Sequence, residues 1–281
     1  MDVALIGVGL VGTALAERFR RAGLSVIGYD PRPEACETLK SIGGEVATSS
    51  RAAVESASIA VLSLPDSNIV AKVIDEIESV MRGRTIIDTT TGDPDQTADL
   101  GAKLKTLGID YLDATIAGSS GQVRDGNAMV LVGGEMPIFE RMKSLIATFS
   151  EQAFHVGPWG SGARMKLVFN LVLGLNRAVL AEGLSFAKAC GLDPTLALEV
   201  LKIGAAYSTV MDVKGPKMLN GDFTPVARLS QHHKDVRLIL TAAQRAGFDL
   251  PLSRVHDELL TIAEQRGYGD QDNSAIIRAF E

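Results

Sequence analysis

A glycine-rich turn near the N-terminus lies between a predicted strand and a predicted helix. Apolar residues 3–6 precede it, and an amphipathic segment over 11–22 follows. The turn reads Gly7, Val8, Gly9, Leu10, Val11, Gly12. In this spacing the first glycine permits a tight turn, the second lets the backbone approach a diphosphate, and the third lets the helix pack on the strand. The diphosphate then lies at a helix N-terminus, where free N–H groups bind anions. The pattern is typical of a dinucleotide-binding unit, but by itself it is a weak indication.

A second predicted strand, over 26–29, supports this interpretation because it ends at Asp30. A carboxylate at this distance from the glycines accepts hydrogen bonds from the adenosine ribose and repels a 2′-phosphate, so the sequence favours NAD. Arg32 leaves NADP possible, because a guanidinium binds phosphate well. Asp30 in front of Pro31 is also an ordinary turn-forming residue, but that alternative explains less of the pattern.

Strand and helix patterns alternate through the rest of the first half. Further strands are predicted at 59–64, 85–88, 111–117, 128–132 and 153–156, and helices at 67–80 and 94–107. Such alternation is typical of a parallel, doubly wound α/β sheet. We therefore predict a Rossmann-type dinucleotide-binding domain over 1–160.

Ligands of such a sheet collect at the carboxyl ends of its strands. Leu64 and Pro65 follow one predicted strand, and Thr91 follows the next. The Thr91 hydroxyl is either a contact for the nicotinamide ribose or part of a helix cap. Gly118, Ser119 and Ser120 follow the strand after that, where backbone N–H groups suit a substrate carboxylate. A plain loop is the alternative for that segment.

The second half, 161–281, reads as an all-helical domain for substrate binding and oligomerisation. Helices are predicted at 163–190, 195–203, 207–219, 226–246 and 252–265. Apolar residues surround the first of these almost completely, which is typical of a buried helix. Gly174 and Gly183 each cost about 1 kcal/mol inside a helix, a cost that close approach of another backbone would explain. A homo-oligomer, dimer or tetramer, is expected.

Lys166 and Asn170 are the polar pair inside this apolar helix. They are four residues apart, so their side chains share one face. We expect burial to lower the pKa of the lysine, which suits a group that exchanges a proton during hydride transfer. The alternative is a lysine that extends from the helix start to solvent.

Other features argue against several classes of site and partner. The net charge of −6 is spread along the chain, so we expect no nucleic-acid partner. Cys36 and Cys190 lack metal-ligand spacing, and the adjacent His232 and His233 point to different faces of a helix, so no metal site is expected. No apolar run is expected to span a membrane. The strand predicted directly after Met1 leaves no room for a signal segment, so a cytoplasmic location is expected.

Taken together, the motifs resemble the β-hydroxyacid dehydrogenase family, which includes 3-hydroxyisobutyrate dehydrogenases and tartronate semialdehyde reductases. Matching segments cover nearly the whole chain: the glycine turn, 64–65, 88–91, 113–121, the helix with Gly162, Lys166 and Asn170, then 234–235 and 267–275. The resemblance implies that Lys166 is the general acid and base, that Asn170 binds substrate, and that Thr91 and Lys234 lie near the nicotinamide.

One segment departs from the family pattern. Members often carry a serine-glycine-glycine step that holds the substrate carboxylate, whereas this chain has Ala117 before Gly118, Ser119 and Ser120. The identity of the substrate is therefore not predicted. The general expectation is hydride transfer between a nicotinamide and a small 3-hydroxy acid, or reduction of the matching semialdehyde. Alternatives are a non-catalytic dinucleotide-binding scaffold and an imine reductase-like enzyme, in which another proton donor would more naturally replace the lysine.

Overall fold

The computed structural model describes residues 2–281, which form two compact units. One unit ends at Lys166 and the other comprises Leu167–Glu281. The division falls inside the long helix α8 (Ser161–Ala189) rather than in front of it. The first turns of this helix therefore belong with the sheet, and each unit is described by itself.

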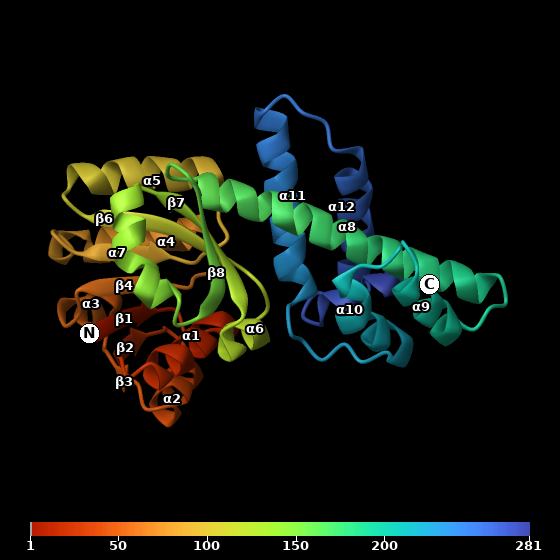
Figure 1. Cartoon of the computed structure of the whole chain (residues 1–281), viewed down its shortest axis with the longest axis horizontal. Coiled ribbons are helices and arrows are strands. Elements are labelled where there is room, and N and C mark those ends of the chain that lie inside the picture. Colours follow the sequence, from red (N-terminus) through yellow and green to blue (C-terminus); the bar gives the residue numbers. More distant parts are fainter. Residues whose placement is uncertain (1) are drawn as a thin grey trace. The chain divides into compact units, whose positions relative to one another are not determined.

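An eight-stranded sheet forms the centre of the first unit, in the order β3-β2-β1-β4-β5-β6-β7-β8 (Figure 1). The strands are β1 (Asp2–Ile6), β2 (Ser25–Tyr29), β3 (Glu45–Val46), β4 (Ile59–Leu62), β5 (Thr85–Asp88), β6 (Asp110–Ala117), β7 (Ala128–Gly134) and β8 (Ser150–Gly157). All residues of β4 and β5 are buried, because helices cover both faces of the sheet. The predicted doubly wound α/β fold is confirmed.

Helices on the two faces pack into two separate apolar clusters. Those of this unit are α1 (Leu10–Arg21), α2 (Pro33–Ser41), α3 (Ser50–Glu55), α4 (Ser67–Ile77), η1 (Glu78–Val80), α5 (Pro94–Thr106), α6 (Ser120–Asp125) and α7 (Met136–Ile146). Phe19 of α1 and Phe139 of α7 belong to one cluster, and Ile74 of α4 and Leu104 of α5 to the other. The sheet is thus covered on both faces, as Figure 1 shows.

The sheet is not wholly parallel, contrary to the prediction. β7 runs antiparallel to β6, with Ala117 opposite Met129. The two strands are joined by the short helix α6 and one residue in left-handed conformation, Gly126, with φ of 80°. A parallel neighbour needs a crossover of about a dozen residues or more, and this connection is too short to provide one. β8 is again parallel to its neighbour β7.

The second unit is helical. It contains most of α8 and then α9 (Pro194–Ile203), α10 (Thr209–Asn220), α11 (Leu229–Arg245), α12 (Pro251–Gln265) and the 3₁₀ segment η2 (Asn273–Phe280). Its apolar core includes Leu184 of α8, Leu198 of α9, Met211 of α10, Val236 of α11 and Leu260 of α12. The predicted succession of helices is confirmed.

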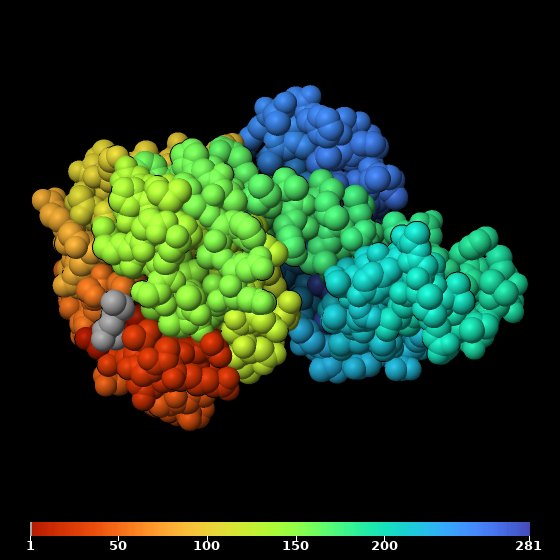
Figure 2. All heavy atoms as spheres, viewed as in Figure 1, coloured from red at the N-terminus to blue at the C-terminus, as the bar shows by residue number. Residues whose placement is uncertain are grey.

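The prediction that α8 is buried on nearly all sides is wrong. One face of the helix is buried, but a row of apolar side chains is exposed: Met165, Val168, Val172, Val179 and Phe186. Side chains of α8 (green) are visible on the surface in Figure 2. By length and composition alone α8 is able to cross a membrane, with a mean hydropathy of 1.4 over its most apolar window. That window is 44% buried, and core helices of soluble proteins meet the same criterion.

Candidate active site

The glycine turn leaves an open stretch of backbone at the N-terminus of α1. A Cβ at Gly7, where φ is +92°, would lie 2.3 Å from the carbonyl oxygen of Ser63, and one at Gly12 would lie 2.1 Å from that of Gly7. Neither position accepts a side chain. A Cβ at Gly9 would meet only the Nη2 of Arg32, at 4.0 Å. The tight turn, the close helix packing and the open middle glycine fit a diphosphate at the helix N-terminus.

Asp30 lies beside this turn at the end of β2. It is 6% exposed, and its Oδ2 accepts a hydrogen bond from the backbone N–H of Val8 at 2.9 Å. The guanidinium of Arg32 donates to both carboxylate oxygens, each at 2.9 Å. Burial raises the pKa of Asp30, but hydrogen bonds from Arg32 and Val8 outweigh burial and the pKa is lowered. The carboxylate is therefore ionised, and the half-exposed Arg32 already neutralises part of its charge.

Hydrogen bonds join the loops that follow β4 and β5. Thr90 Oγ1 accepts from the backbone N–H of Leu64 at 3.1 Å, and the Thr90 N–H donates to Asp88 Oδ1 at 2.9 Å. Asp93, not Thr91, is the N-cap of α5, because its side chain accepts from the first-turn N–H groups of Asp95 and Gln96. Leu64 and Thr91 thus lie at adjoining strand ends, as the sequence suggests, and Thr90 is the residue missed there.

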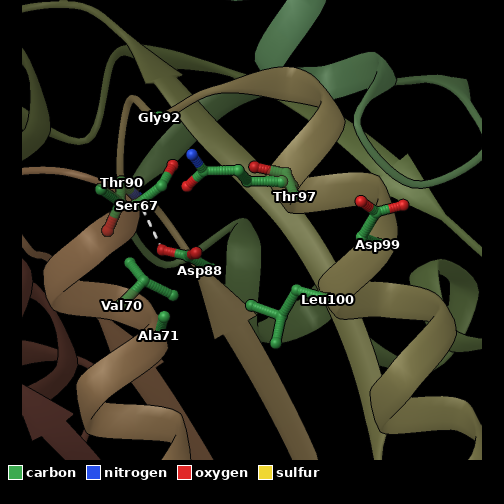
Figure 3. A pocket seen from close by; sticks show the side chains of 10 residues that line it. Ser67, Val70, Ala71, Asp88, Thr90, Gly92, Thr97, Asp99 and Leu100 are labelled. Atoms are coloured by element: carbon green, nitrogen blue, oxygen red, sulfur yellow. Dashed lines mark hydrogen bonds between the residues drawn. The ribbon is translucent and has the colours of Figure 1, made fainter.

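A small pocket lies next to these loops, between α4 and α5. Its volume is about 220 Å³, below the roughly 300–1,000 Å³ that is usual for a small-molecule site. Asp88 forms its floor, and Val70, Thr97 and Leu100 line its sides (Figure 3). Burial raises the pKa of Asp88, whose Oδ2 accepts from the hydroxyl of Tyr111 at 3.0 Å. No residue of the glycine turn lines this pocket, so the pocket is separate from that turn.

The segment Gly118–Ser120 begins the helix α6, which the sequence did not predict. Ser119 and Gln122 form a capping box: the Gln122 N–H donates to Ser119 Oγ at 3.2 Å, and the Ser119 N–H donates to Gln122 Oε1 at 2.9 Å. The Ser119 N–H is therefore engaged within the chain. The Ser-x-x-Gln spacing is a recognisable capping signal, and it identifies Gln122 as the residue missed here.

Lys166 and Asn170 occupy the buried face of α8, as predicted. Lys166 is 7% exposed and Asn170 is 6% exposed. Asn170 Nδ2 donates to Asp235 Oδ2 at 2.9 Å, and Lys234 Nζ lies 3.1 Å from Asp235 Oδ1. Asp235, on α11, therefore joins Asn170 and Lys234 within the second unit. The sequence singled out both neighbours but gave Asp235 no role in the site.

The two histidines of α11 have separate environments. The ring nitrogens of His233 contact Asp257 at 2.9 Å and Glu264 at 3.0 Å. The ring of His232 packs on that of His256, with 5.2 Å between centroids. Within residues 2–281, no group of three or more His, Cys, Asp or Glu side chains is arranged to hold a metal ion. The cysteines are free thiols, Cys36 half-buried and Cys190 exposed.

Comparison with known proteins identifies both units. A family model described as the NAD binding domain of 6-phosphogluconate dehydrogenase matches residues 2–157. A second, described as NAD-binding of NADP-dependent 3-hydroxyisobutyrate dehydrogenase, matches residues 160–280. Together the two models span nearly the whole chain.

Individual relatives agree with these models along their full length. The chain is 30% identical to 2-hydroxy-3-oxopropionate reductase of Escherichia coli, over 100% of this chain and 97% of that protein. It is 28% identical to 2-(hydroxymethyl)glutarate dehydrogenase of Eubacterium barkeri, over 100% and 95%. The crystal structure of 3-hydroxyisobutyrate dehydrogenase from Salmonella typhimurium superposes with a TM-score of 0.91 at 26% identity, covering 99% of both chains. With the glycine turn, the buried Asp30 carboxylate and the buried lysine in place, the chain belongs to the β-hydroxyacid dehydrogenase family of NAD(P)-dependent oxidoreductases.

Proposed function

We propose that the protein transfers a hydride between the nicotinamide of NAD(P) and a small 3-hydroxy acid, or reduces the matching semialdehyde or keto acid. The observation that carries the proposal is the burial of Lys166 and Asn170 on one face of α8. The names of relatives support the substrate class: besides the two given above, L-threonate dehydrogenase of Cupriavidus necator is 26% identical over 99% of this chain and 96% of that protein.

In this proposal Lys166 moves the proton. The cofactor, when bound, supplies the carbon that accepts or donates the hydride. In oxidation the neutral amine of Lys166 would take the proton from the substrate hydroxyl and become ammonium; in reduction the ammonium would stabilise the developing oxyanion and return the proton to it. We propose that the Asn170 amide lies beside that amine and binds the substrate. Its amide is oriented by the bond to Asp235.

The remaining site residues are proposed from their positions in the chain. The glycine turn would hold the diphosphate and Asp30 the adenosine ribose. Leu64, Pro65 and Thr91 would flank the nicotinamide, with Lys234 near the same end. Gly118, Ser119 and Ser120 would hold the substrate carboxylate. We expect NAD to be preferred, because Asp30 is ionised. Arg32 keeps NADP possible, because its guanidinium can exchange the carboxylate of Asp30 for a 2′-phosphate.

The lysine is tested by Lys166→Ala against Lys188→Ala, which changes an exposed lysine on the same helix. We expect Lys166→Ala to lower kcat by roughly 10²- to 10⁴-fold, the usual contribution of a positioned acid or base. NADH affinity should be unchanged in both variants. The measurement is NAD(P)H absorbance over a panel of 3-hydroxy acids and aldehyde acids, each with NAD and with NADP.

Different results of this panel would contradict different parts of the proposal. Turnover by Lys166→Ala at the rate of Lys188→Ala would remove the lysine from the chemistry. A strong preference for NADP would make Arg32, rather than Asp30, the cofactor selector. Binding of NADH without turnover of any substrate would favour the non-catalytic scaffold.

We also propose that the protein acts as a homo-oligomer. The exposed apolar row on α8 supports this, since monomeric soluble proteins rarely expose contiguous apolar patches of large area. A cytoplasmic location, and the absence of nucleic-acid, membrane and metal partners, stay predictions from the sequence.

A further inference from the structure

One buried carboxylate lies where the first turn of α8 meets the sheet. Asp113, on β6, is 1% exposed. Its Oδ1 accepts from the backbone N–H of Gly160 at 3.2 Å, and its Oδ2 accepts from that of Ala163 at 3.1 Å. The start of a helix leaves such N–H groups without intrahelical partners. Asp113 therefore caps α8 from a strand that is far away in the sequence.

Two glycines allow this close approach. A Cβ at Gly133 would lie 2.4 Å from Asp113 Oδ1, and one at Gly162 would lie 2.6 Å from the Asp113 carbonyl oxygen. Two residues further along β6, the hydroxyl of Thr115 donates to the carbonyl oxygen of Gly162 at 3.0 Å. The strand thus holds both N–H groups and a carbonyl group of the helix start.

Lys166 follows Ala163 by three residues, less than one turn of the helix. We propose that Asp113 is a positioning residue for Lys166: its ionised carboxylate fixes the start of α8 against β6 and so determines where the lysine amine lies. This inference rests on the proposed function of Lys166. Asp113 touches no reacting atom in this arrangement, and its effect passes through the helix backbone.

Protonation should change the hydrogen bonds of this cap at mildly acidic pH. Burial raises the pKa of Asp113 to about 6, although the hydrogen bonds from Ala163 and Gly160 lower it. Above that pH both oxygens accept N–H groups. Below it, one oxygen carries a proton and no longer accepts from its N–H group, so one of the two cap hydrogen bonds is lost as pH falls through about 6, although the buried site as a whole favours the protonated carboxyl. The groups around it are Asp88 on β5, whose charge adds to the rise, and Tyr111 on β6, whose own pKa is raised.

The fluorescence of the single tryptophan of the chain can report on this junction independently of catalytic activity. Trp159 directly precedes Gly160, and its Nε1 donates to the carbonyl oxygen of Tyr111 at 2.9 Å. Its ring fills the space beside Gly101, where a Cβ would lie 2.4 Å from Trp159 Cγ. His155 on β8 lies nearby, with Nε2 at 2.8 Å from the carbonyl oxygen of Gly134. A His155→Gln variant is the control for this neighbouring imidazole.

The test compares Asp113→Asn with Asp110→Asn, the same change on a partly exposed aspartate at the start of β6. We expect the Trp159 emission to change as pH falls in the wild type and in the Asp110→Asn and His155→Gln variants, with its midpoint near the pKa of about 6. Asp113→Asn should lose that transition. Its kcat should fall by roughly 10- to 100-fold, as expected for a misplaced catalytic group, while NADH affinity stays unchanged.

The emission titration tests the role of Asp113, and the turnover of Lys166→Ala tests the proposed function. The proposed role of Asp113 is overturned if wild-type emission shows no transition between about pH 5 and pH 7, if Asp113→Asn keeps the transition, or if Asp113→Asn turns over as fast as Asp110→Asn. If Asp113→Asn does not fold, the wild-type titration and Thr115→Val, which removes the hydroxyl bonded to the carbonyl oxygens of Gly162 and Leu131, decide the question. If Lys166→Ala retains full turnover, the proposed function fails while the emission titration still tests the cap.

Discussion

Asp272 and Lys214 form a buried ion pair in the helical unit, with Nζ of the lysine 2.8 Å from Oδ1 of the aspartate. Burial raises the pKa of Asp272, but Lys214, Ser274 and the Val226 N–H outweigh it and lower the pKa to about 2. A carboxylate with a depressed folded-state pKa stabilises the fold above its unfolded pKa. That contribution, about 2 kcal/mol for this shift, is lost as pH falls from about 4 to about 2.

Removal of the lysine should therefore destabilise the protein strongly. Lys214→Met leaves Asp272 as a buried, unpaired charge, and we expect a loss of about 3–5 kcal/mol in the free energy of unfolding. Lys217→Met on the same helix is the control, because its partner Asp222 is exposed, and should cost about 1 kcal/mol or less. Urea unfolding at neutral pH measures both. Equal losses in the two variants would contradict the importance of burial.

Residues of the candidate site differ in how far the sequence could predict them. Asp30, Lys166 and Asn170 stand at fixed offsets within one motif or one helix, so local spacing was enough. Asp113 and Asp235 act through bonds to segments 47 or more residues away. The groups that these two aspartates bind are known only once the chain has folded, and no pattern in the sequence identifies those groups.

At the scale of the element, two of the three glycines of α8, Gly174 and Gly183, lie in the interior of the helix and have different surroundings. A Cβ at Gly174 would lie 2.6 Å from His232 Nε2 and 2.7 Å from His256 Cε1. The close neighbours of Gly174 are therefore imidazole rings, not the approaching backbone that the sequence suggested. A Cβ at Gly183 meets nothing within 4 Å among the described residues.

These surroundings predict opposite effects of the same substitution. Gly174→Ala should destabilise the protein by roughly 1–3 kcal/mol, because the added methyl group overpacks against two buried rings. Gly183→Ala should stabilise it by about 1 kcal/mol through helix propensity alone. Thermal unfolding at one protein concentration compares the pair. A destabilised Gly183→Ala variant that also associates more weakly would instead indicate that another copy approaches this glycine.

Most elements could be predicted from periodicity and from their glycine and proline boundaries. The direction of β7 could not, because strand and turn propensities do not encode which neighbour a strand pairs with. α6 escaped prediction since its glycine and serine residues are typical of a loop, and only the capping bonds between Ser119 and Gln122 turn them into a helix start. The period of α8 indicated apolar residues on all sides but could not tell which of them remain exposed.

At the scale of the whole molecule, the exposed row on α8 predicts self-association. Val179 is 65% exposed, so Val179→Asp should leave the fold intact, since surface substitutions usually change stability by about 0.5 kcal/mol or less. In an oligomer it would place a charge in an apolar interface and lower the assembled mass. Sedimentation or light scattering measures that mass. Glu182→Gln, at an exposed polar position of the same helix, is the control. A wild-type protein that is monomeric at micromolar concentration would contradict the proposal.

The two edges of the sheet restrict which surfaces are suitable for association. β3, at one edge, is only two residues long. β8, at the other, pairs with β7 through an irregular register, and its outer residues include the exposed Glu151 and Gln152. Short strands, bulges and polar edge residues all hinder the addition of further strands. These edges hinder the addition of strands from other molecules to the sheet. At high concentration the native protein should therefore associate through its helices into closed oligomers rather than through its strands into fibres.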